Sequence, residues 1–216
     1  MNPFRYPKVK HRRAPDPGPF SDYRAYKPHL RKEFKGQCVY CRMPDSLKGQ
    51  EAFGVDHYQP KSRFSADAAA YSNLFYVCNV CNTWKGPFWP DQTQRAFGLF
   101  IPNPCSHEMF SHLRYQDSVV SPHSAAGEFT VALLDLNEER VRQIRQFVLE
   151  NIAQKLAARR EICRTLADIR ARLDTAADPL VAMRLRNGKT LSDNHLVRID
   201  RDLKLLAGEY AALPVG

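Results

Sequence analysis

Apolar residues recur at steps of three and four over the last third of the chain, and this spacing predicts helices. The first run begins after Leu136 and contains Val141, Ile144, Val148, Ile152, Leu156, Ile162, Leu166, Ile169 and Leu173. Such a stripe is typical of an amphipathic helix, and Asn137 is the expected N-cap because its side chain can accept a backbone N–H. We interpret the stripe as intramolecular packing, with a seam for a partner as the alternative.

A second helix is predicted nearer the C-terminus. Arg186-Asn187-Gly188 indicates the end of a helix, since glycine commonly follows the last turn, and Ser192 or Asp193 is the expected start of the next one. The apolar positions of this helix are Leu196, Ile199, Leu203, Leu206, Tyr210 and Leu213. We therefore expect residues 131–216 to form a mainly α-helical C-terminal region.

The first 130 residues have a different pattern, in which short apolar runs are separated by turns. Thirteen of the 15 prolines and 21 of the 23 aromatic residues precede residue 131, which predicts a compact and irregular region. Phe53–His57 and Leu74–Val77 predict two short strands, and a helix is expected from Cys78 to about Lys85, where Gly86 and Pro87 end it. The expected class is α+β, with a core at residues 38–130.

Positive charge is concentrated at the start of the chain. The whole sequence carries +9, and residues 1–37 hold ten Lys and Arg against three acids. With Tyr6, Tyr23 and Tyr26 between them, these bases suit a polyanion such as a nucleic acid. A solvated arm that only aids solubility is the alternative. We expect residues 1–37 to form a basic arm with a helix.

The sequence argues against a membrane protein and an exported protein. No apolar stretch approaches the roughly 18 residues that a membrane-spanning helix needs. The basic residues of Met1–Arg13 are not followed by the apolar segment of a secretory signal. We expect a cytoplasmic protein without membrane contact, and its 44% of hydrophobic residues is enough for a folded core.

Four of the six cysteines form two C-x-x-C pairs. The pairs are Cys38-Val-Tyr-Cys41 and Cys78-Asn-Val-Cys81. Two thiolates three positions apart can face one ion, and two such pairs complete a tetrahedral zinc shell with ligands at about 2.3 Å. Disulfides or redox chemistry are the alternative, but thiols stay reduced in the cytosol, which favours zinc. We predict a closed, structural zinc site.

Between the two cysteine pairs, an acid stands directly before a histidine. Asp56-His57 ends the first predicted strand, Asn73 precedes the second strand, and Asn82 follows the second cysteine pair. Together with the C-x-x-C pairs and Lys85-Gly86, this order resembles the HNH endonuclease superfamily, the ββα-metal nucleases. The resemblance covers about residues 26 to 90. This segment is similar to a bacterial branch of the HNH superfamily whose zinc knuckles frame the active site.

The resemblance implies a role for each of these residues. His57 would be the general base that takes a proton from the attacking water. Asp56 and Asn82 would bind one catalytic divalent ion, Mg²⁺ or Mn²⁺, because carboxylate and amide oxygens suit such hard cations. Asn73 would tie the loop to the strand and orient His57. The implied fold is a ββα-metal core with a helical C-terminal extension.

Three basic residues near this motif are candidates for nucleic-acid contacts: Lys61, Arg63 and Lys85. The expected reaction is hydrolysis of DNA phosphodiester bonds, with RNA left open as a substrate. The alternative from another class is a nucleic-acid-binding zinc protein with an inactive nuclease site. A further hypothesis is a bacterial defence or toxin effector that stays silent until a regulatory protein partner signals.

Overall fold

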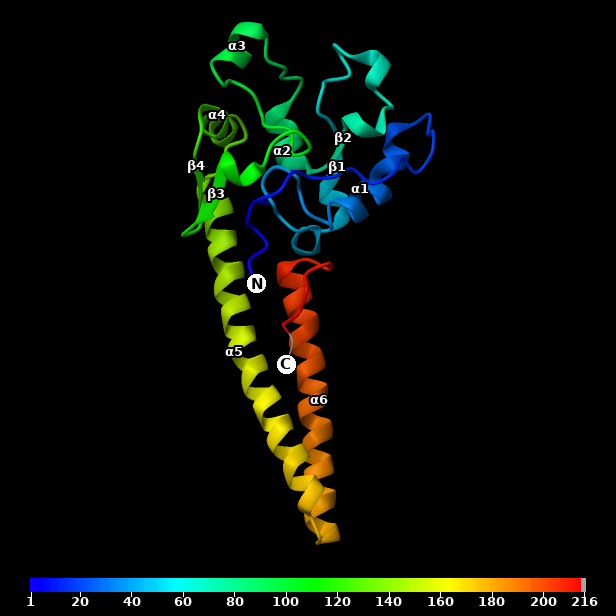
Figure 1. Cartoon of the computed structure of the whole chain (residues 1–216), viewed down its shortest axis with the longest axis vertical. Coiled ribbons are helices and arrows are strands. Elements are labelled where there is room, and N and C mark those ends of the chain that lie inside the picture. Colours follow the sequence, from blue (N-terminus) through cyan, green and yellow to red (C-terminus); the bar gives the residue numbers. More distant parts are fainter. Residues whose placement is uncertain (215–216) are drawn as a thin grey trace.

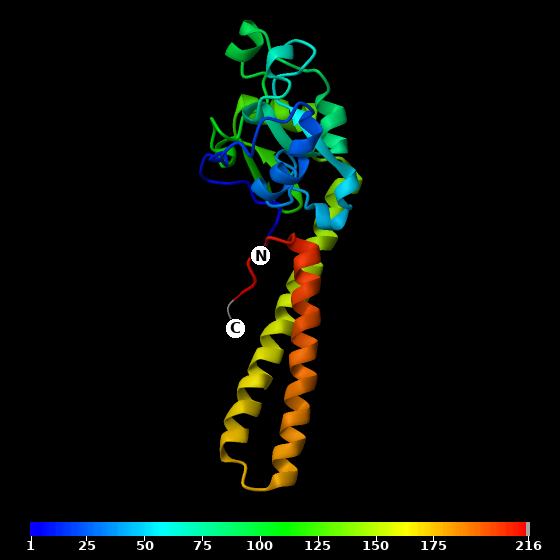
Figure 2. The ribbon, with the colours of Figure 1, turned by 90° about the vertical axis from the view of Figure 1, so that its right-hand side faces the viewer.

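The computed structural model describes residues 1–214 and divides them between a rounded head and a long helical hairpin (Figure 1). Turned by 90°, the molecule shows the two hairpin helices running side by side away from the head (Figure 2). The hairpin helices are α5, Glu139–Thr175, and α6, Pro179–Ala207. The α+β class is confirmed. No helix in residues 1–214 is both long and apolar enough to cross a membrane.

A β-hairpin followed by a short helix lies at the centre of the head. Strands β1, Phe53–His57, and β2, Leu74–Cys78, pair antiparallel, with Phe53 opposite Cys78 and His57 opposite Leu74. Helix α2, Asn79–Lys85, follows β2 without a connecting loop. Every residue of β2 is buried, in agreement with its uninterrupted apolar sequence. The two predicted strands and the predicted helix are confirmed to within one residue.

The N-terminal segment packs onto the head instead of extending from it. Phe4 and Tyr6 are buried in the same apolar core as β2, and the Tyr6 hydroxyl donates to the Tyr40 carbonyl at 2.9 Å. Further along, Glu33 accepts from His11 Nε2 at 2.7 Å and pairs with Arg13 Nε at 2.9 Å. Glu33 belongs to α1, Lys27–Glu33. Some of the predicted basic arm is therefore used in internal contacts.

A second small unit completes the head. Strands β3, Leu113–Gln116, and β4, Val119–Pro122, form an antiparallel pair, and α4, Ala125–Leu133, follows them. Ser124 caps α4 by accepting the backbone N–H of Gly127 at 3.0 Å. The short helix α3, Gln92–Ala96, begins with a capping box at Asp91. In Figure 1, β3, β4 and α4 lie beside the start of α5, whereas α3 lies at the end of the head that is farthest from the hairpin.

The apolar stripe of α5 packs against α6 and the head, as its spacing predicts. Its buried members include Val148, Ile152, Leu166 and Ile169, and α6 contributes Ile199 and Leu203. Two ion pairs join the helices, Lys155 with Asp202 at 2.6 Å and Arg159 with Asp200 at 2.8 Å. A stripe on each helix is enough to form this two-helix seam.

Two predictions about the hairpin are wrong. The N-cap of α5 is Glu138, whose side chain accepts from Val141, because the Asn137 side chain is engaged by both backbone groups of Val120 on β4. The predicted break at Gly188 is also absent, since α6 runs without interruption from Pro179 to Ala207. Gly188 faces Ile169 of α5, so helix packing outweighs its weak helix propensity. Asp178 before Pro179 is the start signal that we missed.

Candidate active site

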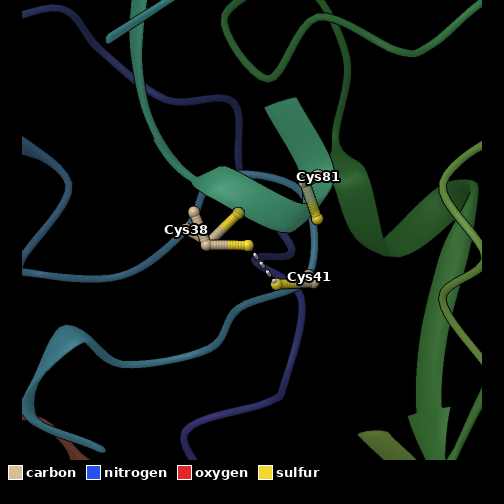
Figure 3. A group of neighbouring side chains, drawn as sticks. Cys38, Cys41 and Cys81 are labelled. Atoms are coloured by element: carbon tan, nitrogen blue, oxygen red, sulfur yellow. Dashed lines mark hydrogen bonds between the residues drawn. The ribbon is translucent and has the colours of Figure 1, made fainter. Parts of the chain in front are cut away.

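The four paired cysteines meet in one buried cluster at the base of the ββα unit. Cys38 and Cys41 lie on a tight loop, Cys78 ends β2, and Cys81 lies in the first turn of α2 (Figure 3). Their sulfur atoms all lie within 4.8 Å of one another. Cys41 Sγ and Cys78 Sγ are 3.7 Å apart. Tetrahedral zinc with bonds of about 2.3 Å places its sulfur ligands roughly 3.8 Å apart, so the spacing fits.

The chemistry of the cluster also fits a cation. Burial raises the pKa of the Cys38 thiol well above its ordinary value, and hydrogen bonds from the neighbouring cysteines, Cys38 first, lower the pKa of Cys41 well below it. Four thiolates this close together would repel one another, so they require a positive ion between them. A bound zinc ion would hold all four as thiolates and close the shell with no open position for substrate. The cluster is therefore a candidate structural zinc site, and it joins the first loop to β2 and α2.

His57 lies at the end of β1, where its ring is held from one side. Its Nε2 is 2.9 Å from the Ala68 carbonyl oxygen. A carbonyl only accepts, so Nε2 carries the hydrogen and Nδ1 keeps the lone pair that can take a proton. The Tyr23 ring contacts the imidazole edge-on, with centroids 4.5 Å apart. Burial lowers the pKa of His57, which favours the neutral imidazole that a general base requires.

Asp56, the residue before His57 in β1, is almost fully buried and is held by two side chains of the head. Its Oδ2 accepts from the Tyr40 hydroxyl at 2.6 Å, and its Oδ1 lies 2.9 Å from Lys85 Nζ. Lys85 also donates to the His57 carbonyl at 2.7 Å. Both partners of the Asp56–Lys85 ion pair are almost fully buried, with 4% and 2% of their side chains exposed.

This network corrects the expectation that Lys85 contacts phosphate. Its ammonium group is enclosed in the head, where it neutralises Asp56 and holds the backbone of His57. Tyr40 stands between the two cysteines of the first pair, so a continuous chain of contacts runs from the cysteine cluster to the backbone of His57. A buried charge needs such a partner, which is why Lys85 faces inward.

Asn73 closes the long loop between the two strands. Its Oδ1 accepts from the Gln59 N–H at 2.8 Å, and its Nδ2 donates to the carbonyls of Gln59 and Asp67 at 3.0 and 3.3 Å. Its own carbonyl accepts from the Tyr58 N–H at 2.9 Å. These contacts fix the loop that also presents Ala68 to His57. The geometry accords with the structural role that the sequence suggested for Asn73.

A pocket of about 390 Å³ opens beside this network. The residues that line it are Tyr23, Val55, Asp56, His57, Pro60, Lys61, Ser62, Asn82, Gly86 and Pro87. Asn82 comes from α2 and the other two candidate residues of the catalytic centre come from β1. The pocket therefore collects Asp56, His57 and Asn82 from two elements, while Asn73 supports it from outside.

Comparison with protein families agrees with this geometry. Residues 38–88 match the family model described as HNH endonuclease. The chain contains an HNH domain. The matched segment begins at the first cysteine of the cluster and ends just beyond α2, so it includes every candidate catalytic residue. Searches of the curated proteins and of the solved structures returned no match.

The basic residues around the HNH pocket differ in exposure. Lys61 is exposed at the rim, and its ammonium lies 4.9 Å from the centroid of the Tyr23 ring. Arg63 is also exposed and donates to the Trp89 carbonyl at 3.0 Å. Lys61 lines the pocket, Arg63 does not, and Lys85 is buried beneath it.

The oxygen donors of the pocket fit a hard divalent cation. Asn82 offers an amide oxygen, and each Asp56 carboxylate oxygen keeps a second lone pair beyond the hydrogen bond that it already accepts. Mg²⁺ and Mn²⁺ prefer such ligands and take further oxygens from water or phosphate. A cation here would share Asp56 with Lys85. Sequence reasoning missed Tyr40 and Lys85 as partners of Asp56, because a residue pattern does not reveal which way a lysine or tyrosine points.

Proposed function

We propose that the HNH domain hydrolyses phosphodiester bonds of DNA with Mg²⁺ or Mn²⁺ as its catalytic ion. The observation that carries the proposal is the imidazole of His57, which is fixed in one tautomer at the wall of a pocket shared with Asn82 and Lys61. A purely structural zinc module has no need for a buried, oriented base beside oxygen donors.

His57 would act through Nδ1. With the Nε2 hydrogen committed to the Ala68 carbonyl, Nδ1 can accept a proton from a water molecule as its oxygen attacks phosphorus. The attack forms one P–O bond and breaks the bond to the leaving oxygen. A divalent ion held by Asp56 and Asn82 would supply Lewis-acid stabilisation of the charge on the phosphate and the leaving oxygen.

Other side chains would position these groups. Lys85 fixes both the Asp56 carboxylate and the carbonyl of His57, and Asn73 fixes the loop that carries Ala68. Lys61 and Arg63 at the rim would bind flanking phosphates, which adds affinity without sequence preference. The Asp56 carboxylate is therefore bonded to Tyr40 and Lys85, and each of its two oxygens would keep one lone pair for a cation.

The alternative is a nucleic-acid-binding zinc protein whose nuclease site is inactive. Incubation of supercoiled plasmid with wild type and with His57→Ala, in Mg²⁺, Mn²⁺ or EDTA, distinguishes the two functions. We expect cleavage by wild type with either ion, none with EDTA, and none by His57→Ala at unchanged zinc content. Plasmid that both proteins shift in a gel but leave intact would establish the alternative.

The substrate is tested with labelled duplex DNA, single-stranded DNA and RNA under the same conditions. We expect the fastest cleavage on DNA. The hypothesis of a defence or toxin effector stays a prediction, and it requires toxicity in cells that His57→Ala relieves.

A further inference from the structure

The outward surface of α6 differs from an ordinary solvated helix in its charges. Its exposed charged side chains are all basic, namely Arg184, Arg186, Arg198, Arg201 and Lys204. The acids of α6 are each paired within the hairpin, Asp193 with Lys189, Asp200 with Arg159 and Asp202 with Lys155. Within residues 1–214, none of the five exposed bases forms an ion pair.

The outward surface of α5 provides the contrast. Its exposed side chains include acids as well as bases, and three of its ion pairs lie within the helix, Arg142 with Glu139, Arg164 with Glu161 and Arg172 with Asp168. Such pairs neutralise each other and are typical of a surface that faces only water. The two helices belong to the same hairpin, yet only α5 has exposed acids among its exposed bases. The exposed charges of α6 are all basic.

Three exposed leucines lie among polar residues along the same surface of α6. Eight exposed positions succeed one another at steps of four and three: Leu180, Arg184, Asn187, Leu191, Asn194, Arg198, Arg201 and Leu205. We call these eight residues the outer seam. Leu191 is 71% exposed, and Leu180 and Leu205 are 52% and 54% exposed. Steps of four and three place all eight residues on one face of the helix, where three leucines stand beside three arginines and two asparagines.

The inner face of α6 already has its own seam with α5. Ile199 and Leu203 are buried there, so the outer seam is a second stripe on the opposite side. It extends from Leu180 to Leu205, along most of α6. The hairpin leaves the head (Figures 1 and 2), and α6 meets the head near its C-terminal end, where Ser46 Oγ donates to the Leu205 carbonyl at 2.8 Å. All eight side chains of the outer seam are nevertheless exposed.

A second copy of the chain would fit the outer seam poorly. In a parallel pair of α6 helices, every arginine of one copy would lie beside the same arginine of the other copy. In an antiparallel pair centred between Leu191 and Asn194, Arg184 of one copy would lie opposite Arg201 of the other. Like charges at such positions are destabilising. A nucleic acid would satisfy the arginines, but it offers nothing to the three leucines of the seam.

We propose that the outer seam of α6 binds an amphipathic, acidic helix of a partner protein. Leucines of the seam would pack on the apolar stripe of that helix, and Arg184, Arg198 and Arg201 would pair with its carboxylates. Interfaces combine apolar packing with charge complementarity in this way, and the charges specify the partner. The loops that line the HNH pocket lie on the side of the head away from the hairpin, so the bound helix leaves the pocket open (Figure 1).

The probe for this test is a synthetic 28-residue helix with leucine at its heptad core positions and glutamate on its flanks. Binding to the full-length protein is followed by fluorescence anisotropy at physiological salt. We expect saturable binding of the glutamate helix and none of a matched helix with lysine flanks. The triple variant Arg184→Glu/Arg198→Glu/Arg201→Glu should weaken binding roughly tenfold or more, because each attraction becomes a repulsion.

The matched control reverses three exposed and unpaired bases of α5, as Arg140→Glu/Arg160→Glu/Arg170→Glu. It changes the net charge equally and should leave binding within about twofold, since charges beyond a Debye length of about 8 Å are screened. Circular dichroism verifies that both variants keep their helices. Leu191→Asn should also weaken binding, which a purely electrostatic contact would not show.

Three results would overturn the proposal. The first is an equal weakening of glutamate-helix binding in both triple variants, which would mean that the helix is attracted by the overall positive charge of the protein and not by the outer seam. The second is tight binding of a DNA duplex that only the α6 variant loses while the glutamate helix does not bind. The third is a dimer, measured by light scattering, that only the α6 variant dissociates.

Discussion

The head and the hairpin of this protein are stabilised in different ways, and the difference matches the roles that we propose for them, chemistry in the head and recognition on the hairpin. The head is irregular and depends on a cysteine cluster and on the buried chain Tyr40–Asp56–Lys85 that ends at the His57 carbonyl. The hairpin is regular and depends on apolar stripes with half-exposed ion pairs. Side chains that must be held in one orientation require a buried network like that of the head. A long surface that a partner could contact requires a regular structure like the hairpin.

Removal of a cysteine tests this difference most strongly. Cys38→Ser should lose stoichiometric zinc and unfold the head, at a cost comparable to the whole stability of a domain, roughly 5–15 kcal/mol. The control is Cys163→Ser in the hairpin, which should keep its zinc and its melting temperature. Metal analysis and thermal denaturation measure both. Equal zinc content in the two variants would contradict the zinc assignment.

The two Lys–Asp pairs allow a direct comparison of the regions. Lys85→Met leaves Asp56 buried without its partner and should cost about 3–5 kcal/mol of unfolding free energy. Lys155→Met opens a half-exposed pair with Asp202 in the hairpin and should cost under about 1 kcal/mol. Urea denaturation gives both values. A small loss for Lys85→Met would mean that the Asp56 network does not hold the head together.

Two helical glycines give effects of opposite sign. A Cβ at Gly127 of α4 would lie 2.0 Å from the His112 carbonyl oxygen, so Gly127→Ala should destabilise by about 2–3 kcal/mol. At Gly188 the nearest atom would be Ile169 Cδ1 at 3.7 Å, an ordinary contact. Gly188→Ala should therefore stabilise the protein by about 0.5–1 kcal/mol. Thermal shifts in the same direction would show that one of these environments is misassigned.

The smallest effect is expected at the rim of the pocket. Lys61→Ala should weaken DNA binding a few-fold, and the slope of log affinity against log salt should fall by about one, because one phosphate contact is lost. Melting temperature should not change, since Lys61 is exposed. Anisotropy titrations at several salt concentrations, performed in a His57→Ala background, measure the slope. An unchanged slope would remove Lys61 from the interface.

The sequence predicted the elements that local patterns specify. The strand at Leu74 is an apolar run, the helix at Asn79 ends at a glycine and a proline, and the cysteine pairs have the spacing of metal ligands. All three are found. The resemblance to the HNH family, carried by residues in the order of its motif, was confirmed by the family match over residues 38–88.

Contacts between distant segments were beyond the reach of those patterns. Lys85 looked like a surface base, and only the fold brings Asp56 against it. Asn137 looked like an N-cap, but β4 engages its side chain. Gly188 looked like a helix end, yet a neighbour on α5 covers it. In each case a tertiary partner determined the outcome, and local propensity is too weak to oppose it.

The central claim is that His57 is the base of a nuclease, and paired histidine variants test it most directly. Single-turnover cleavage of labelled DNA with Mg²⁺ is compared for wild type, His57→Ala and His112→Ala, the last lying outside the pocket. We expect His57→Ala to slow cleavage by about 10²–10⁴-fold at unchanged zinc content, and His112→Ala to stay near wild type. Undiminished cleavage by folded His57→Ala, or equal losses in both variants, would contradict the claim.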